Sequence, residues 1–375
     1  MDARAERWLR LVHAPSVGHA RRRRLLAGLG DIDRIAGAAT GELRGLGISG
    51  EAAAVLRGDE CPAGLQADLD WAAAPGCHLL TPDHPDWPPR LSTLDDMPPV
   101  LYVRGDPEVL RQPALAIVGS RNPTPAGAET AHQLAHHLAA AGLVIVSGLA
   151  HGIDAAAHEG ALAAGGLTVA VAGTGVDRVY PARHAQLARR IADEGALISE
   201  LPIGTPPSRA AFPQRNRIVT GLCLGTLVVE AAVQSGSLVS ARHAMEQGRE
   251  VFAIPGSIHS PLARGCHRLI RQGAKLVETA EDILEELGPQ IATPTRGEPR
   301  GAVSETTAKD GQVPDDAAPD PEYAQVLEAL DWEPRGVDDI ASRAGLGPGE
   351  VASMLLRLEL DGVIRTVPGG LYQRR

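Results

Sequence analysis

Apolar runs and helical stretches alternate through the middle of this 375-residue chain. Six runs of Val, Ile, Leu and Ala lack polar–apolar alternation, as expected for strands that are buried on both faces of a parallel sheet. They lie at residues 114–118, 143–146, 167–172, 196–199, 226–229 and 250–254. Helical patterns lie between them, for example at 126–141, 184–194 and 237–247. This order predicts an α/β fold with an extended Rossmann-like, doubly wound parallel sheet.

Changes in composition predict three ordered parts and a linker. Residues 1–66 are helical with glycine punctuation, and the stretch 43–52 resembles a helix-hairpin-helix (SAM-like) turn; the alternative is a packing domain in which glycine permits tight turns. Residues 67–287 carry the Rossmann-like domain. Residues 288–320, rich in Pro, Gly, Thr and acidic side chains, predict a flexible linker. Residues 321–375 show three helical patterns and a short hairpin, the order of a winged helix.

Composition excludes several classes of protein. The net charge of −10 argues against a uniformly basic nucleic-acid binder, although a local patch can still decide binding. An aromatic content of 3 % argues against a surface that stacks many bases on successive rings. The four cysteines form no Cys-x-x-Cys pair, so neither a zinc site nor a disulfide framework is indicated. The N-terminus lacks a signal-peptide core and no run of some 18 apolar residues could span a membrane. We therefore expect a cytoplasmic protein without a metal or cofactor.

Three groups of residues that are rich in hydrogen-bond donors stand near predicted strand ends. They are Gly119, Ser120 and Arg121; Arg215, Asn216 and Arg217; and Ser235, Gly236 and Ser237. Such residues offer many donors and almost no acceptor charge. The carboxyl ends of parallel strands meet at one edge of a sheet, where helix N-termini attract anions. Together with glycine-rich loops at 148–152 and 173–175, these groups predict a site for a phosphate-bearing ligand.

Two other patterns suggest cofactor chemistry but do not meet its requirements. The loop 173–175 would need a third glycine to match the dinucleotide fingerprint, and Arg178 stands at that position. His132 and His136 are four residues apart, a metal-ligand spacing, but no third ligand is evident. An ordinary solvated helix face is the favoured interpretation of this histidine pair.

Asp154 and His158 are also four residues apart and follow a predicted strand. They could form an acid–base pair. The favoured interpretation is that they cap and brace the helix that begins at Ile153.

Taken in order, the motifs resemble the DNA-processing protein A family (DprA, also called Smf). The segments that carry the resemblance are 116–121, 146–158, 173–181, 198–200, 212–217, 235–238 and 254–256. The similarity covers nearly the whole chain. It implies a single-stranded-DNA-binding protein of natural transformation, which protects incoming strands and helps to load RecA. It also implies a homodimer through the Rossmann domain and no established catalytic activity.

The resemblance places DNA contacts on three segments of this chain. They comprise Gly119, Ser120, Arg121, Phe212, Arg215, Asn216, Arg217, Ser235, Gly236 and Ser237. Phe212 lies in a Pro-rich stretch and is expected either to stack on a base or to plug its loop onto the domain. Arg121 is expected to matter more for binding than Arg21 to Arg24, which should point toward solvent.

A more distant resemblance supports a rival function. The core is also similar to phosphoribohydrolases, which use a glutamate in glycosidic cleavage, so a nucleotide-binding enzyme or sensor is the alternative. Glu230 lies one residue too far along the motif, and the Pro-Gly-Gly lead is missing. We therefore expect Glu230 to be a structural carboxylate at a strand end.

The winged helix lacks a basic reading helix. Residues 348–360 carry Glu350, Arg357 and Glu359, a pattern that argues against deep reading of a major groove. A protein contact or weak duplex binding, as an accessory role, is favoured for this part of the chain over reading of a major groove.

Overall fold

The computed structural model describes residues 3–291, 321–330, 334–360, 363–367 and 370–374. The chain divides into two compact units, Met1–Thr295 and Arg296–Arg375. Most of the predicted linker at 288–320 lies outside the described residues. Helix α13 (Ala280–Ile291) nevertheless continues past the predicted start of the linker.

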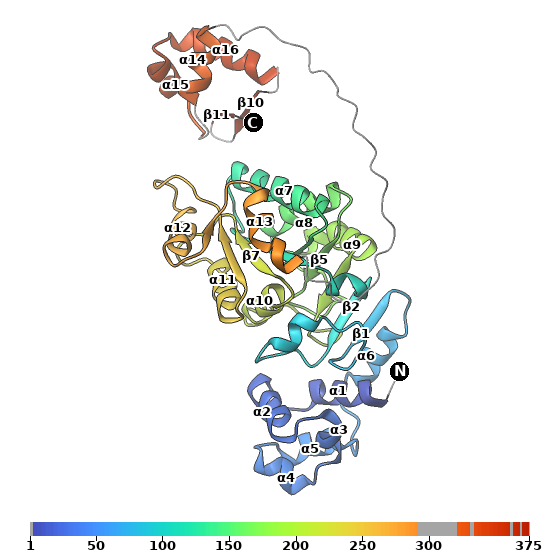
Figure 1. The fold of residues 1–375 in the computed structure, drawn as a ribbon. Helices are drawn as coiled ribbons and strands as arrows, with labels where there is room; N and C mark the ends of the chain where they lie inside the picture. The colour runs from blue at the N-terminus through green and yellow to red at the C-terminus, as the bar shows by residue number, and fades with distance from the viewer. Residues whose placement is uncertain (1–2, 292–320, 331–333, 361–362, 368–369, 375) are drawn as a thin grey trace. The chain divides into compact units, whose positions relative to one another are not determined.

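Within the described residues, the first unit is built on a nine-stranded sheet (Figure 1). Its strands are β1 (Cys77–Leu80), β2 (Leu101–Gly105), β3 (Ala114–Val118), β4 (Val144–Ser147), β5 (Thr168–Val171), β6 (Ala196–Ser199), β7 (Gly225–Val228), β8 (Glu250–Ala253) and β9 (Lys275–Leu276). Their spatial order is β1-β2-β6-β5-β4-β3-β7-β8-β9. From β6 to β9 all neighbours are parallel, whereas β1, β2 and β6 pair antiparallel.

The six predicted strands are confirmed as β3 to β8, and β1, β2 and β9 were not predicted. Strands β1 and β2 lie on either side of the Pro-containing segment 83–89 and form the antiparallel edge of the sheet. Strand β9 has only two residues, both exposed, so no buried apolar run marks it in the sequence.

Helices cover both faces of the sheet because its strands present apolar side chains alternately to each side. One face carries α7 (Pro125–Ala140), α8 (Ile153–Ala163) and α13, with α9 (Ala185–Glu194) beside α8; the other carries α10 (Ala211–Gly221), α11 (Ser237–Glu246) and α12 (Arg264–Arg271). In β3, Leu115 and Ile117 join the first group of helices, and Ala116 and Val118 join the second. No helix among the described residues is long and apolar enough to cross a membrane.

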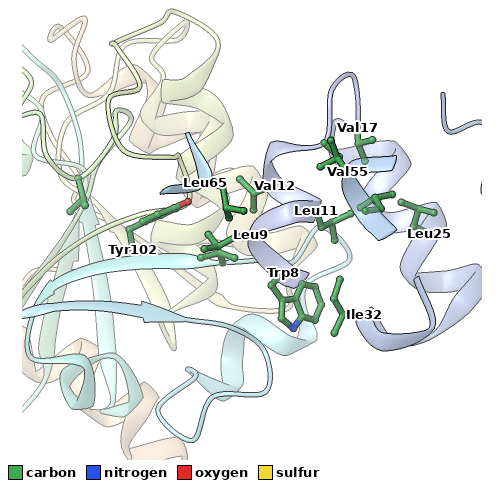
Figure 2. Close-up of a cluster of buried hydrophobic side chains, with 14 of the residues drawn as sticks. Trp8, Leu9, Leu11, Val12, Val17, Leu25, Ile32, Val55, Leu65 and Tyr102 are labelled. Carbon is green, nitrogen blue, oxygen red and sulfur yellow. The ribbon is translucent and has the colours of Figure 1, made fainter. Parts of the chain in front are cut away.

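The N-terminal helices share a hydrophobic core with the sheet. They are α1 (Ala3–His13), α2 (His19–Leu29), α3 (Ile32–Gly37), α4 (Thr40–Gly45), α5 (Gly50–Arg57) and α6 (Leu65–Ala72). Figure 2 shows Leu9 and Leu65 of this group facing Tyr102 of β2, and all three side chains are buried. The expected domain boundary at residue 66 falls inside α6. Because the N-terminal helices and the sheet share one hydrophobic core, they pack as one body.

A buried carboxylate joins the N-terminal helices to the sheet. Asp68 of α6 accepts hydrogen bonds from the Tyr102 hydroxyl and from the Ile203 amide (3.0 Å), and its Oδ2 lies 2.6 Å from His13 Nε2. Burial and the Asp68 carboxylate raise the pKa of Tyr102 well above its usual value, which keeps the hydroxyl protonated as a donor. A single carboxylate therefore ties α1, β2 and the loop before α10 to α6.

One expectation about the N-terminal arginines is wrong. Arg22 does not point toward solvent; its guanidinium is largely buried and donates to the Val12 carbonyl (3.0 Å). Burial lowers the pKa of Arg22. Arg21, Arg23 and Arg24 are exposed, as expected.

The second unit is a small helical domain with a hairpin. Its elements are α14 (Pro321–Leu330), α15 (Val337–Ala344), α16 (Pro348–Leu360), β10 (Ile364–Val367) and β11 (Leu371–Arg374). Val326, Ile340, Leu355 and Ile364 bring the three helices and the hairpin into one core. This arrangement confirms the predicted winged helix. Two residues of the predicted turn, Pro368 and Gly369, lie outside the described residues.

We expect Asp68→Ala to destabilise the first unit by about 3 kcal/mol or more, because it leaves a buried hydroxyl and amide without their acceptor. Chemical denaturation monitored by circular dichroism measures the loss. Asp70→Ala is the matched control, since Asp70 is exposed on the same helix and bonds only to Gln66 in the described structure; it should change stability by less than about 0.5 kcal/mol. Equal effects of the two substitutions would contradict the central role of Asp68.

Candidate functional site

The candidate site lies where the order of the parallel strands reverses. The chain runs outward from β3 through β4, β5 and β6, and then returns to the other side of β3 with β7. The loops that leave the carboxyl ends of β3 and β7 therefore diverge to opposite faces, which opens a crevice between them. A pocket of about 730 Å³ occupies this place, and we call it the switch-point pocket.

The switch-point pocket gathers nine of the ten residues that were predicted as a site. They are Gly119, Ser120, Arg121, Phe212, Arg215, Asn216, Ser235, Gly236 and Ser237. The first group is separated from the other two by about a hundred residues in the sequence, and the parallel pairing of β3 with β7, together with α10, brings them to the same pocket. Of the two predicted glycine-rich loops, the loop 148–152 lines the pocket with Gly148, whereas the loop 173–175 does not line it.

Arg121 and two aromatic rings form one wall of the switch-point pocket. Arg121 is exposed, and its guanidinium carbon lies 5.9 Å from the centre of the Phe212 ring, within range of a cation–π contact. The Tyr180 ring packs on Phe212 with centroids 5.4 Å apart and planes inclined at 36°. Phe212 itself lies in the first turn of α10, not in a loop as expected. No carboxylate of the described chain pairs with Arg121, so its charge is available to a ligand.

Arg215 contributes charge from below the surface. Its Nη1 donates to the Val171 carbonyl (2.5 Å), and only 5 % of the residue is exposed. The guanidinium fits because Gly148 has no side chain; a Cβ there would lie 2.0 Å from Arg215 Nη1. Burial lowers the pKa of Arg215 to about 10, so the group still carries its charge at neutral pH.

The serine loop presents the positive end of a helix to the switch-point pocket. Helix α11 begins at Ser237, and no side chain caps it at Gly236. The Ser235 and Ser237 hydroxyls lie 2.7 Å apart and both line the pocket. An uncapped helix N-terminus with two hydroxyls is an arrangement that suits a phosphate oxygen.

Arg217 does not join the other predicted residues. It is 7 % exposed and pairs with Glu200 (2.5 Å) and Asp96 (3.1 Å). Residues that are two positions apart lie on nearly opposite faces of a helix. Arg215 therefore reaches the pocket, and Arg217 points away from it. The charge of Arg217 is used inside the fold, and the residue is removed from the candidate contacts.

Two residues of the switch-point pocket were missed by sequence reasoning. Tyr180 lies in the segment that follows β5, and Arg209 precedes Phe212 by three residues. Arg209 could have been included because it belongs to the same segment as Phe212. Tyr180 lies in the segment 173–181 that carries the family resemblance, but only the fold sets its distance from Phe212.

Asp154 and His158 brace α8, as expected, but neither side chain caps this helix, whose N-cap residue is Gly152. Asp154 accepts hydrogen bonds from the amides of Gly148 (3.1 Å) and Ala150 (3.3 Å), which shapes the loop before α8. Burial raises the pKa of Asp154. His158 contacts the Thr168 hydroxyl through Nδ1 (2.7 Å), and that hydroxyl donates to the Ile145 carbonyl. The imidazole Nδ1 must therefore carry the hydrogen, since the single hydroxyl hydrogen is already donated.

Glu230 is a structural carboxylate, as predicted. It accepts hydrogen bonds from the Thr124 amide (2.9 Å) and the Thr124 hydroxyl (2.6 Å). Thr124 in turn caps α7 by accepting from the Gly127 amide. The carboxylate thus anchors the end of the loop that carries Arg121. Within the described residues, no group of three or more His, Cys, Asp or Glu side chains could hold a metal ion.

The fold and the switch-point pocket define a Rossmann-like protein with a crevice lined by hydrogen-bond donors, joined to a winged helix. Residues 78–288 match the family described as DNA recombination-mediator protein A, and residues 311–370 match the DprA winged helix domain. The chain belongs to the DNA-processing protein A (DprA/Smf) family.

Individual relatives agree with this assignment. Protein Smf of Escherichia coli is 43 % identical over 312 residues, which cover 83 % of this chain and 81 % of that protein. The X-ray structure of DNA processing protein A from Streptococcus pneumoniae aligns with a TM-score of 0.68 at 36 % identity, over 76 % of this chain and 99 % of the other. A structure of DNA processing protein A from Helicobacter pylori, which concerns that protein's single-stranded DNA binding mode, aligns with a TM-score of 0.52 at 31 % identity, over 56 % and 96 % of the chains.

We expect His158→Asn to make the free energy of unfolding less dependent on pH below about pH 6.5. Burial lowers the pKa of His158 to about 3, so below about pH 6.5 the unfolded chain binds a proton that the folded chain refuses. The wild type should therefore lose up to about 1.4 kcal/mol per pH unit relative to the variant between about pH 6 and 4. Urea unfolding at several pH values measures this difference. Parallel profiles for the two proteins would contradict it.

Proposed function

We propose that this protein binds single-stranded DNA in the switch-point pocket. The observation that carries the proposal is the convergence of nine predicted residues, almost all donors, on one crevice with an uncapped helix end. The single-stranded DNA binding described for the Helicobacter pylori relative supports it. A net charge of −10 for the whole chain requires that binding be local, and this pocket is a local concentration of positive groups.

The lining of the switch-point pocket suggests how a strand is held. Arg121, Asn216 and the serine loop Ser235–Gly236–Ser237 would take phosphate oxygens, with Gly119 and Ser120 allowing the backbone to come close. Arg215 would add charge from beneath without leaving its carbonyl partner. Phe212 would belong to the base side of the pocket.

The same lining favours a single strand over a duplex. A crevice with an aromatic wall can accept a base only when its ring face is unpaired and unstacked. A duplex offers phosphates but no free base faces, so it would lose this part of the interaction. The phosphate contacts make the affinity dependent on salt.

Membership of the family supports a wider role. We propose that the protein acts in the cytoplasm in natural transformation, protects incoming strands, helps to load RecA and works as a homodimer through its Rossmann domain. We propose no catalytic activity. The glutamate that a phosphoribohydrolase would need is Glu230, and its oxygens are bound to Thr124. An accessory role for the winged helix, as a protein contact or in weak duplex binding, stays part of this proposal.

The full chain should bind single-stranded DNA more tightly than duplex of the same length. Affinity for the single strand should fall with salt, with a log–log slope of about 0.7 for each phosphate neutralised. Gel-shift titrations at two salt concentrations measure both properties. Equal affinity for the duplex, or binding that does not change with salt, would overturn the proposal.

Arg121→Ala should weaken single-strand binding by about 1.5–3 kcal/mol, the range for a hydrogen bond to a charged group. Arg189→Ala is the matched control, because Arg189 is equally exposed on α9 but does not line the pocket. Arg22, which is buried, would not serve as a surface control. Fluorescence anisotropy with a labelled oligonucleotide measures each variant. Comparable losses for Arg121→Ala and Arg189→Ala would indicate general charge rather than a contact in the pocket.

A further inference from the structure

Tyr180 is the most solvent-exposed large apolar side chain among those that line the switch-point pocket. It is 51 % exposed and lies between β5 and the short 3-10 helix η3 (Ala182–His184). Half of this ring is therefore open to solvent at the pocket, where a planar group of a ligand could contact it. The other described tyrosine of this unit, Tyr102, is fully buried.

Phe212 cannot serve as the open ring of the pocket in the same way. One side of Phe212 is held against the backbone at Gly173, where an added Cβ would lie 2.8 Å from the ring. Tyr180 packs on Phe212, and Arg121 lies within 5.9 Å of its centre. Phe212 is therefore half-buried among three partners, and Tyr180 extends the aromatic surface outward from it.

We infer that Tyr180 is the base-stacking residue of the switch-point pocket and that Phe212 is its support. This inference rests on the proposed function and refines it, because it assigns the base contact to a residue outside the predicted site. The tyrosine ring offers a free face at the rim, while Arg121 and the serine loop hold the phosphates on either side. Stacking of this kind tolerates any base, since every base has a π-face.

The assignment defines the kind of strand that binds best. A base must leave its neighbours to reach Tyr180, so strands whose bases stack weakly on one another are favoured. Thymine runs should therefore bind more tightly than adenine runs. A backbone without bases should keep only the phosphate contribution.

The experiment compares full-length wild type with Tyr180→Ala and Tyr180→Trp on three oligonucleotides of equal length: oligo-dT, oligo-dA and an abasic strand. Tyr180→Ala should weaken oligo-dT binding by about 5- to 150-fold, the equivalent of one lost base stack. It should leave abasic binding unchanged. Tyr180→Trp should restore affinity, and its added tryptophan fluorescence should be quenched by oligo-dT but not by the abasic strand.

Two controls separate this inference from its alternatives. Arg121→Ala should weaken oligo-dT and abasic binding alike. Ile258→Ala removes another exposed apolar side chain, 75 % exposed and outside the pocket lining, and should affect neither. Thermal melting of each variant tests whether Tyr180 only packs against Phe212 and stabilises the fold.

The outcomes are distinguishable. If the wild type binds no oligonucleotide, the proposed function is wrong and this inference falls with it. If the wild type binds but Tyr180→Ala leaves its preference for oligo-dT over the abasic strand unchanged, only this inference is overturned. A Tyr180→Ala variant that melts several degrees lower and binds normally would identify Tyr180 as a packing residue.

Discussion

The reversal of strand order beside β3 is the constraint on which the rest of the site depends. Because β4 lies on one side of β3 and β7 on the other, the loops after β3 and β7 must separate, and their helices α7 and α11 pack on opposite faces of the sheet. The crevice is thus a result of topology, and its walls are whatever those loops carry. Glu230 fixes one of these walls by holding Thr124 at the start of α7.

Two buried arginines on one helix have different roles because they have different partners. Arg215 and Arg217 stand two residues apart in α10 and are both almost fully buried. Arg217 faces Glu200 and Asp96, which compensate its charge. Arg215 donates to the Val171 carbonyl and feels the charge of the buried Asp154 carboxylate, but its Nε has no hydrogen-bond partner among the described residues. An anion that entered the pocket would complete the set of partners that the fold leaves open.

The sequence predicted the central strands and the winged helix, and nine of the ten residues that it predicted as a site line the pocket, because long apolar runs and donor-rich loops are local signals. It could not distinguish Arg217 from Arg215, since the carboxylates that pair with Arg217 lie far away in the chain. It missed β1 and β9, which carry no fully buried run, and it also missed β2, although Leu101, Tyr102 and Val103 form a short buried run. Tyr180 was missed because its place beside Phe212 is set only when β5 and α10 come together.

The hydrogen bonds of Asp68 have a consequence for how the chain can be divided. Ile203, which donates to Asp68, lies on the segment that leads from β6 into α10, the helix that carries Phe212 and Arg215. His13 and the apolar faces of α1 to α5 complete the same core. A chain shortened to begin at residue 67 would keep every pocket residue but would expose that core to water. The N-terminal helices are therefore part of the body that supports the pocket, whereas the winged helix has a hydrophobic core of its own.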